Sequence, residues 1–151
     1  MRSFVLKVVC SNLPSLFFQS ALDAIVRFVV GRSLEVKVAG RYAGVLVKSL
    51  VSVRPKETLD TIMPRLQRTL NALIGGEEVA TETPLDDAVL FHLLLLKMCV
   101  FTSDVDALEP HLPAIESILE KSVHFIDKDA QSYDALPPLG STIPAGVKEI
   151  I

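Results

Sequence analysis

The stretch GRYAGVLVKSLVSVRPKETLDTIMPRL, residues 40–66, decides the fold class, because it indicates two helices joined at a proline. Pro55 ends a first helix over about 35–53, since the residue before a proline avoids the α region, and it opens the second helix. The second helix is predicted to end at the glycines of positions 75 and 76. Pro64 falls inside it and is expected to kink it, because proline lacks the N–H that would bond to the carbonyl of residue 60.

Both helices show apolar residues at a helical period. The second carries one apolar face, made of Leu59, Ile62, Met63, Leu66, Leu70, Leu73 and Ile74. For the first we predict a solvent-facing stripe of Lys37, Arg41, Gly44, Lys48 and Ser52, opposite an apolar side of Val38, Tyr42, Val45, Leu46 and Leu50.

The chain before this stretch predicts two more helices. Residues 2–12 form a short one, and Pro14 opens another that stops at Gly31. Its apolar residues also follow a helical period and include Leu22, Ile25 and Val26.

The chain after this stretch predicts a helix over 85–101, with Thr83 as its N-cap, Pro84 as its first residue and Asp86 and Asp87 at the positive end of its dipole. This helix is apolar almost all round, so burial on several sides is expected. A short turn near 104–109 and a helix over about 110–126 follow. Residues 127–151 show no period and are interpreted as an irregular or disordered tail.

Helix, short loop and helix therefore repeat along residues 1–126, with helical content well above one half and no strand. Antiparallel helix pairs with prolines near their starts are typical of an all-α fold, specifically an α-solenoid of the HEAT or armadillo type. The alternative is an ordinary helical bundle. The solenoid is favoured because the helix over 85–101 is apolar nearly all round and no terminal helix looks like a polar cap.

Composition narrows the functional classes. The net charge of −3 gives no basic field for nucleic acid, and no aromatic residues are interleaved with the basic ones to stack bases. Half of the residues are hydrophobic and the mean hydropathy is +0.43, but the most apolar run, residues 88–101, is shorter than the roughly 20 residues that a membrane span needs. Cys10 and Cys99 lie in apolar surroundings, which is typical of small buried side chains in a reduced compartment.

No motif for phosphate, dinucleotide or zinc binding occurs, so no catalytic, cofactor-binding or metal-ligating residue is predicted and the chain is not expected to be an enzyme. His92 and Cys99 share a helix face, but core packing explains them better than a metal site, which needs three or four ligands. His111 and His124 add no ligand spacing. A basic group of Lys37, Arg41, Lys48, Arg54, Lys56, Arg65 and Arg68 is interpreted as a solvated helix face, with acidic peptides or polyphosphates as the less favoured ligands.

Four segments resemble the large HEAT-repeat proteasome activator family. They are VAGR at 38–41, RPKETLDTIMPRL at 54–66, LDDAVLFHLLLL at 85–96 and, more loosely, LPAIESILEKSVHF at 112–125. The resemblance covers about residues 14–126, and every matching element is structural.

The resemblance implies a piece of a long α-solenoid that caps the proteasome core particle and promotes ubiquitin-independent degradation, including that of acetylated histones, in the nucleus and cytoplasm. It implies no active site, and inositol phosphates as ligands of basic openings in the full-length protein. It implies no direct contact with nucleic acid or membrane. The family's C-terminal tail with its penultimate tyrosine has no counterpart in GVKEII, so an internal fragment or truncated homologue is expected. The alternative function is an independent α-solenoid adaptor that binds another protein.

Overall fold

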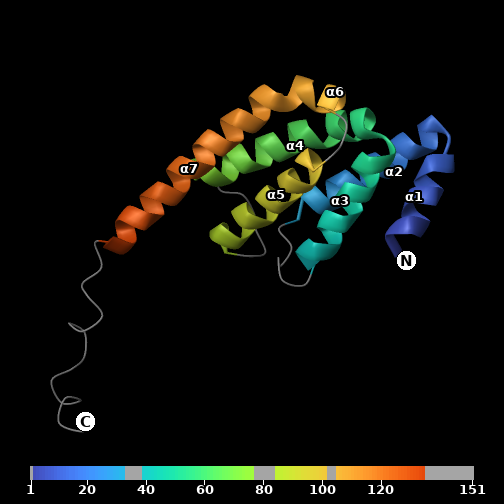
Figure 1. Ribbon diagram of the computed structural model, residues 1–151. Coiled ribbons are helices and arrows are strands. Elements are labelled where there is room, and N and C mark those ends of the chain that lie inside the picture. The colour runs from blue at the N-terminus through green and yellow to red at the C-terminus, as the bar shows by residue number, and fades with distance from the viewer. Residues whose placement is uncertain (1, 33–38, 77–83, 102–104, 135–151) are drawn as a thin grey trace, which may run out of the picture.

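The computed structural model describes residues 2–32, 39–76, 84–101 and 105–134, and the described part of the chain is helical without a strand (Figure 1). The helices are α1 (Arg2–Asn12), α2 (Ser15–Val30), α3 (Arg41–Val53), α4 (Pro55–Gly75), α5 (Leu85–Val100), α6 (Val105–Leu108) and α7 (Leu112–Asp134), with a 3₁₀ turn, η2 (Glu109–His111), before α7. The prediction of an all-α fold is confirmed. Among the described residues, no helix combines the length and the apolar character that a membrane span requires.

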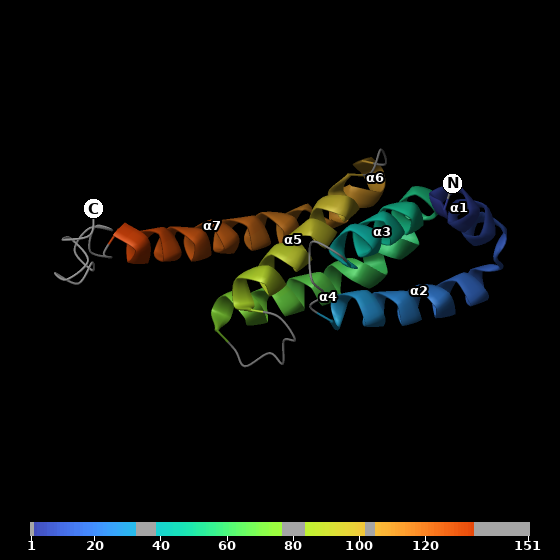
Figure 2. The same ribbon diagram turned by 90° about the horizontal axis from the view of Figure 1, so that it is seen from below.

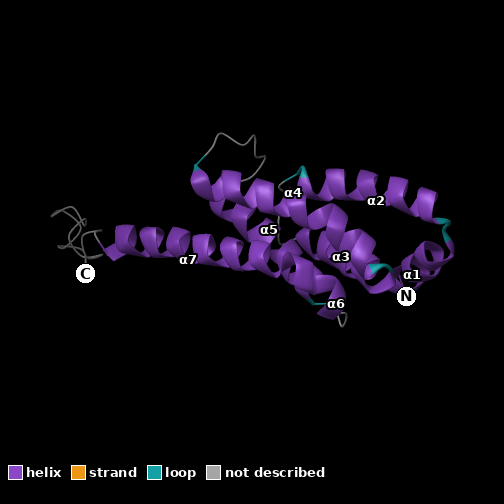
Figure 3. Ribbon diagram, turned by 90° about the horizontal axis from the view of Figure 1, so that it is seen from above, coloured by secondary structure: helices purple, strands orange, loops and turns teal. Residues whose placement is uncertain are grey.

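Alternate helices lie next to one another and form two rows. In the first row α1 packs against α3, and α3 against α5 (Figures 1 and 2). In the second row α4 packs against both α2 and α7, and α7 continues beyond the body of the other helices (Figure 3). The rows meet where α4 contacts α3 and α5. The core between them is almost entirely aliphatic, with Phe18 and Phe91 as its largest side chains.

Prolines and glycines set several helix ends. Pro55 is the first residue of α4, as predicted. Pro14 was expected in the first turn of its helix and is instead the N-cap of α2. At the other end of α4, Gly76 adopts a left-handed conformation with φ of 73°, which a residue with a Cβ rarely adopts. Gly31 follows α2 directly, but with a right-handed backbone, so it ends the helix without a left-handed turn.

Two predicted helix boundaries differ from the structure. α5 begins at Leu85, where the predicted span begins, but Pro84 is its N-cap and not its first helical residue, while Thr83 lies outside the described residues. Asp86 and Asp87 do occupy the first turn. The last helix runs to Asp134 instead of ending near 126, so the first part of the predicted irregular tail is helical.

Pro64 is accommodated inside α4, which is assigned as one unbroken helix from Pro55 to Gly75. The hydrogen bond that Pro64 cannot make would have gone to the carbonyl of Asp60. Both residues are exposed, so water can reach the carbonyl that is left over. The proline therefore falls on the side of the helix where its cost is lowest.

The predicted orientation of α3 is wrong in part. Gly44 was expected on the solvent stripe, yet it is buried, and a Cβ built at this position would lie 3.3 Å from Cγ of Met98 on α5. Tyr42 and Val45, expected on the apolar side, are 67% and 44% exposed. The close approach of α3 to α5 at Gly44 turns the helix so that these two side chains face outward. Lys37 and Val38 lie outside the described residues.

The expectation that α5 is buried on several sides also needs correction. Its inner side chains are buried, including Phe91, Leu95 and Cys99, but Leu90 is 53% exposed. Val100 and Leu85 are exposed as well, and Leu93 and Leu94 are only half-buried. One side of the most apolar helix is therefore open.

Candidate functional site

The basic residues singled out from the sequence do not form one surface. Arg41 and Lys48 lie on the exposed side of α3, whereas Arg65 and Arg68 belong to α4 in the other row. Lys48 lies over the ring of Phe101, with Nζ 4.5 Å from its centroid. The interpretation as ordinary solvated helix faces fits this spread.

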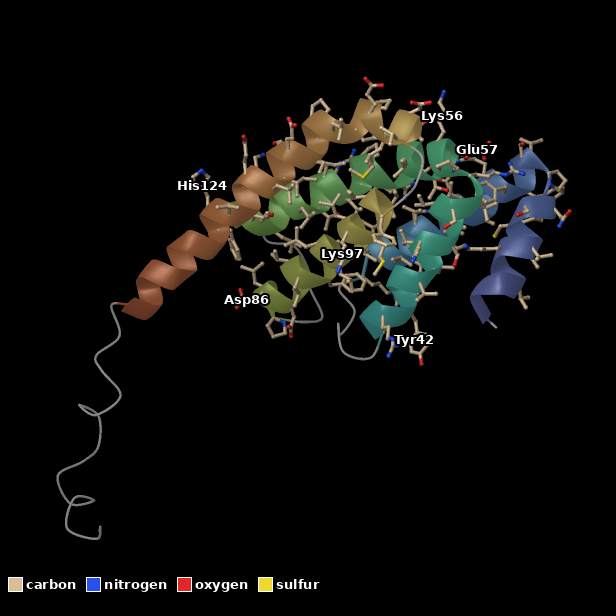
Figure 4. All side chains as sticks on the ribbon, viewed as in Figure 1. Tyr42, Lys56, Glu57, Asp86, Lys97 and His124 are labelled. Atoms are coloured by element: carbon tan, nitrogen blue, oxygen red, sulfur yellow. The ribbon has the colours of Figure 1, made fainter. Side chains whose placement is uncertain are left out.

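Charged and polar side chains at the surface are likewise dispersed (Figure 4). Tyr42 and Asp86 lie at the lower ends of α3 and α5 in that view, Lys56 and Glu57 at the upper start of α4, and His124 on the outer side of α7. Within the described ranges, no group of three His, Cys, Asp or Glu residues is arranged to hold a metal ion. These side chains offer no convergent arrangement for acid–base chemistry.

Among the basic residues that the structure describes, Arg54 has several side-chain partners. It lies between α3 and α4, where Pro55 forces an extended backbone, with φ of −140°. Its guanidinium donates to the carbonyl of Leu13 at 2.6 Å and to Oγ of Ser15 at 3.1 Å, and it pairs with Glu57 at 3.2 Å. It also lies 4.5 Å from the centroid of Phe18. Arg54 therefore ties the α1–α2 turn to the α3–α4 turn, which is a structural role.

Three arginines line a cleft of about 220 Å³ between α2 and α4: Arg27, Arg65 and Arg68. Asp23 neutralises part of this charge, because its carboxylate accepts a hydrogen bond from Arg65 at 3.1 Å. Arg27 donates to the backbone carbonyl of the same aspartate at 3.3 Å. Arg68 is exposed at this cleft. Among the described residues, the cleft is therefore the strongest candidate for an anion-binding site. The sequence pattern did not indicate Arg27 as part of a basic site, because Arg65 and Arg68 lie on a helix about 40 residues later in the chain.

His92 and Cys99 share the inner side of α5, as their spacing predicts, but neither is accessible. Both ring nitrogens of His92 approach backbone carbonyls, and burial raises the pKa of the Cys99 thiol to about 12. Such a thiol stays protonated at neutral pH and is a poor nucleophile. Burial also raises the pKa of the Cys10 thiol, and the Arg54 guanidinium offsets part of that rise. Core packing, the interpretation favoured from the sequence, accounts for His92 and Cys99.

The other two histidines, His111 and His124, form no site with His92 and Cys99 in the described part of the chain. Nε2 of His111 lies 3.1 Å from a carboxylate oxygen of Asp60, which links η2 to α4 at the surface. His124 is exposed on α7. The three histidines are therefore in separate environments.

An apolar groove of about 420 Å³ lies between α5 and the first half of α7. It is lined by Leu93, Leu96, Lys97, Val100, Phe101, Ile115 and Leu119. Phe101 is 66% exposed and Leu119 51%, so these side chains present hydrophobic surface to the solvent. Exposed apolar surface with a charged edge is typical of a protein-binding site. The sequence pattern did not predict this groove, because it led us to expect α5 to be buried on several sides.

Comparison with known proteins gives no relative: no protein-family model, no curated protein and no solved structure matches this chain.

Proposed function

We propose that this chain is a structural and binding segment of an α-solenoid, and that the solenoid is of the proteasome-activator type. The α-solenoid part of this proposal is supported by the arrangement of alternate helices in two rows, α1–α3–α5 and α2–α4–α7. In a solenoid each helix pair packs chiefly on its neighbours, so first helices stack on first helices and second helices on second helices. An ordinary bundle would instead close around one central core.

The exposed apolar residues support the same interpretation. In a solenoid the faces at each end of the stack are apolar unless a polar capping repeat covers them. Here Val5 and Val9 on α1 are 61% and 52% exposed, and the α5–α7 groove is open at the other end of the row. Both ends of the first row thus present apolar surface.

The proteasome-activator half of the proposal rests on the resemblance of residues 14–126. It assigns the segment to a protein that caps the proteasome core particle and promotes ubiquitin-independent degradation, with acetylated histones among its substrates, in the nucleus and cytoplasm. The scattered polar side chains agree with a scaffold that has no active site of its own. The segment's contribution would be to shape and extend the cap.

The test measures binding and activation separately. Purified core particle is immobilised and the chain is passed over it, while turnover of a fluorogenic peptide by core particle is followed in solution. A structural segment is expected to leave turnover unchanged, because a few helix pairs cannot build a dome over the core particle. Binding that is lost when Arg54 is replaced by alanine would support a folded interface. A rise in turnover caused by a monomeric sample would overturn the segment role and indicate a minimal activator.

The α2–α4 cleft favours inositol phosphates as ligands, the class implied by the resemblance. Arg27, Arg65 and Arg68 can supply charge-assisted hydrogen bonds to phosphate. Titration calorimetry with an inositol polyphosphate should show binding that weakens in Arg68→Gln and persists in Arg41→Gln, whose arginine lies on α3. Equal binding by both variants would exclude the cleft.

The α5–α7 groove favours the alternative function, an independent α-solenoid adaptor. A groove between two helices that is lined by aliphatic side chains suits the apolar face of a partner helix. The two functions are separable, because an adaptor has no reason to bind core particle. A chain that fails to bind core particle, and whose groove variant Leu119→Gln loses a different protein partner, would favour the adaptor.

A further inference from the structure

The position of α5 shows how a helix is added to the two rows. α5 packs against α3, its neighbour in the first row, and also against α4, the preceding helix of the second row. It therefore fills the space between the two helices of the preceding pair. The α5–α7 groove is the equivalent space at the last pair, and no described residue of the chain fills it. A further first-row helix would have its place there.

α1 is a first-row helix with one side uncovered. It packs against α3, and its exposed side carries Val5, Val8 and Val9. These positions recur three or four residues apart, so they lie on one side of the helix. The groove is likewise lined by aliphatic side chains, apart from Lys97 and Phe101. The uncovered side of α1 thus has the apolar character of a helix that binds in such a groove.

The second row also has an uncovered apolar side where it begins, on α2. The exposed residues Phe17, Ala21, Ala24 and Phe28 share one side of this helix. Gln19, between the first two of them, donates a hydrogen bond to Thr61 of α4 at 3.2 Å. Residues two apart are separated by about 200° around a helix, so this apolar side faces away from α4.

The other end of the second row, on α7, shows the same spacing. The exposed residues Leu112, Glu116, Leu119 and Val123 share one side of α7. Lys121, between the last two of them, donates a hydrogen bond to Asn71 of α4 at 2.9 Å. This side of α7 therefore faces away from α4 as well. The second row thus has a largely apolar outer side at each end.

The charges beside these two outer sides are opposite in sign. Arg32 is exposed just after α2, with its guanidinium 5.1 Å from the ring centroid of Phe28. Glu116 and Glu120 are exposed on α7. Opposite charges at the edge of an interface select the orientation of the partners, because contact between like charges is disfavoured. The α2 end of one copy therefore suits the α7 end of another better than two α7 ends suit each other.

We propose that a second copy of this chain docks head to tail, with its α1 in the α5–α7 groove and its α2 beside α7. The contact continues both rows from one copy into the next. Since the two surfaces differ, a pair of copies keeps one free groove and one free α1 side, and longer chains of copies form as the concentration rises. This association rests on the α-solenoid part of the proposed function and not on binding to proteasome core particle, which is measured separately.

The main test uses two variants that each block one surface. Leu119→Lys blocks the groove and Val9→Lys blocks α1, at positions that are about half exposed, so the fold should persist. In sedimentation velocity the parent chain should grow in mass with concentration, while each variant alone should keep the mass of one copy. An equimolar mixture of the two variants should form pairs of twice that mass and nothing larger, because it offers one intact groove to one intact α1 side.

Tyr42→Lys is the matched control, since Tyr42 is exposed on α3, outside both surfaces, and it should associate as the parent does. Head-to-tail docking is wrong if the parent keeps the mass of one copy at every concentration, which would leave the groove to a different protein. It is also wrong if Val9→Lys still pairs with itself, as contact between two grooves requires, or if the mixture forms no pairs. If a variant unfolds, Phe17→Lys and Val123→Lys replace the two and should complement each other in the same way.

A charge exchange tests the orientation of α2 beside α7. Arg32→Glu should weaken association about two- to fivefold, the range expected for an exposed ion pair. Adding Glu120→Arg to the same chain should restore the association, since the two exchanged charges meet between copies. A double variant that associates no better than Arg32→Glu would overturn the packing of α2 beside α7.

Discussion

Helices α4 and α5 invert the usual relation between apolar sequence and burial. α5 carries the most apolar run of the chain, yet Leu90, Val100 and Leu85 on it are exposed. α4 is far more polar, yet it packs against α2, α3, α5, α6 and α7. Its apolar side chains at positions 59, 62, 66 and 70 are completely buried. For α4 and α5, the number of neighbouring helices matches the extent of burial, and the hydropathy does not.

The difference has a simple geometric origin. α4 lies in the middle of its row, so both flanks and its inner side are occupied. α5 ends its row, with α3 on one flank and the apolar groove on the other. An apolar helix side that no other helix covers has the composition of a protein–protein interface. We therefore expect the inner and outer sides of α5 to respond very differently to the same substitution.

The largest effect is expected from Leu95→Asp, because Leu95 is completely buried. An unpaired buried charge costs several kcal/mol, which is comparable with the roughly 5–15 kcal/mol stability of a typical domain. Leu94→Asp should cost less, since Leu94 is half-buried, and Leu90→Asp should cost within about 0.5 kcal/mol. Thermal unfolding of the three variants gives this order directly. Equal melting temperatures for Leu95→Asp and Leu90→Asp would show that α5 has no distinct inner side.

The start of α4 should be the next most sensitive point, because Arg54 connects it to the α1–α2 turn. Arg54→Ala removes hydrogen bonds to Leu13 and Ser15 and is expected to cost about 1–3 kcal/mol in urea unfolding. Lys56→Ala, two residues away and exposed, is the control and should cost little. Arg54→Lys should recover only part of the loss, since lysine lacks the planar fork. Full recovery by lysine would mean that charge alone matters here.

Local patterns predicted the elements well. The period of the apolar residues in α4 identified its buried face, with only Ile74 half-buried, and Pro55 placed the junction between α3 and α4 correctly. Proline and periodicity act within a few residues, so a single sequence contains the information needed to recognise them.

Contacts between distant segments could not be predicted in the same way. The orientation of α3 depends on Gly44 meeting Met98, and glycine has no side chain whose hydropathy could indicate this. The two carbonyl partners of His92 include one that lies 62 residues away. The arginine cleft and the apolar groove likewise form only when separate helices come together. These features depend on packing, which a local pattern does not contain.

The pKa of the Cys99 thiol reports whether water reaches the inner side of α5. Burial raises the pKa of its thiol to about 12, whereas an unfolded cysteine has a pKa of about 8.5. The folded chain therefore holds this proton more tightly, so the stabilising contribution is complete below about pH 8.5 and declines as the pH rises towards 12. At about pH 10 the loss should be about 1–2 kcal/mol, and it should be absent in Cys99→Ala.

The same thiol should resist chemical modification in the folded chain. Cys99 should react with an aromatic disulfide reagent at pH 8 only after urea is added, since it is the thiolate that reacts. Rapid modification of Cys99 without urea would show that the inner side of α5 admits solvent.

The smallest effect on stability, and the most direct test of the outer side of α5, is expected from Leu90→Gln. Leu90 is half exposed, so the substitution should change the free energy of unfolding by no more than about 0.5 kcal/mol. Exposed apolar surface at the ends of a helical stack promotes association between copies, so the parent chain should self-associate as its concentration rises. Light scattering should show less association for Leu90→Gln, and less again when Phe101→Gln is added, because Phe101 is 66% exposed at the groove. Tyr42→Gln, at the lower end of α3, is the matched control, since Tyr42 is equally exposed but does not line the groove. If the Tyr42 variant reduces association as strongly, the contacts between copies are unspecific; if only the α5 variants do, the open side of α5 is an interface.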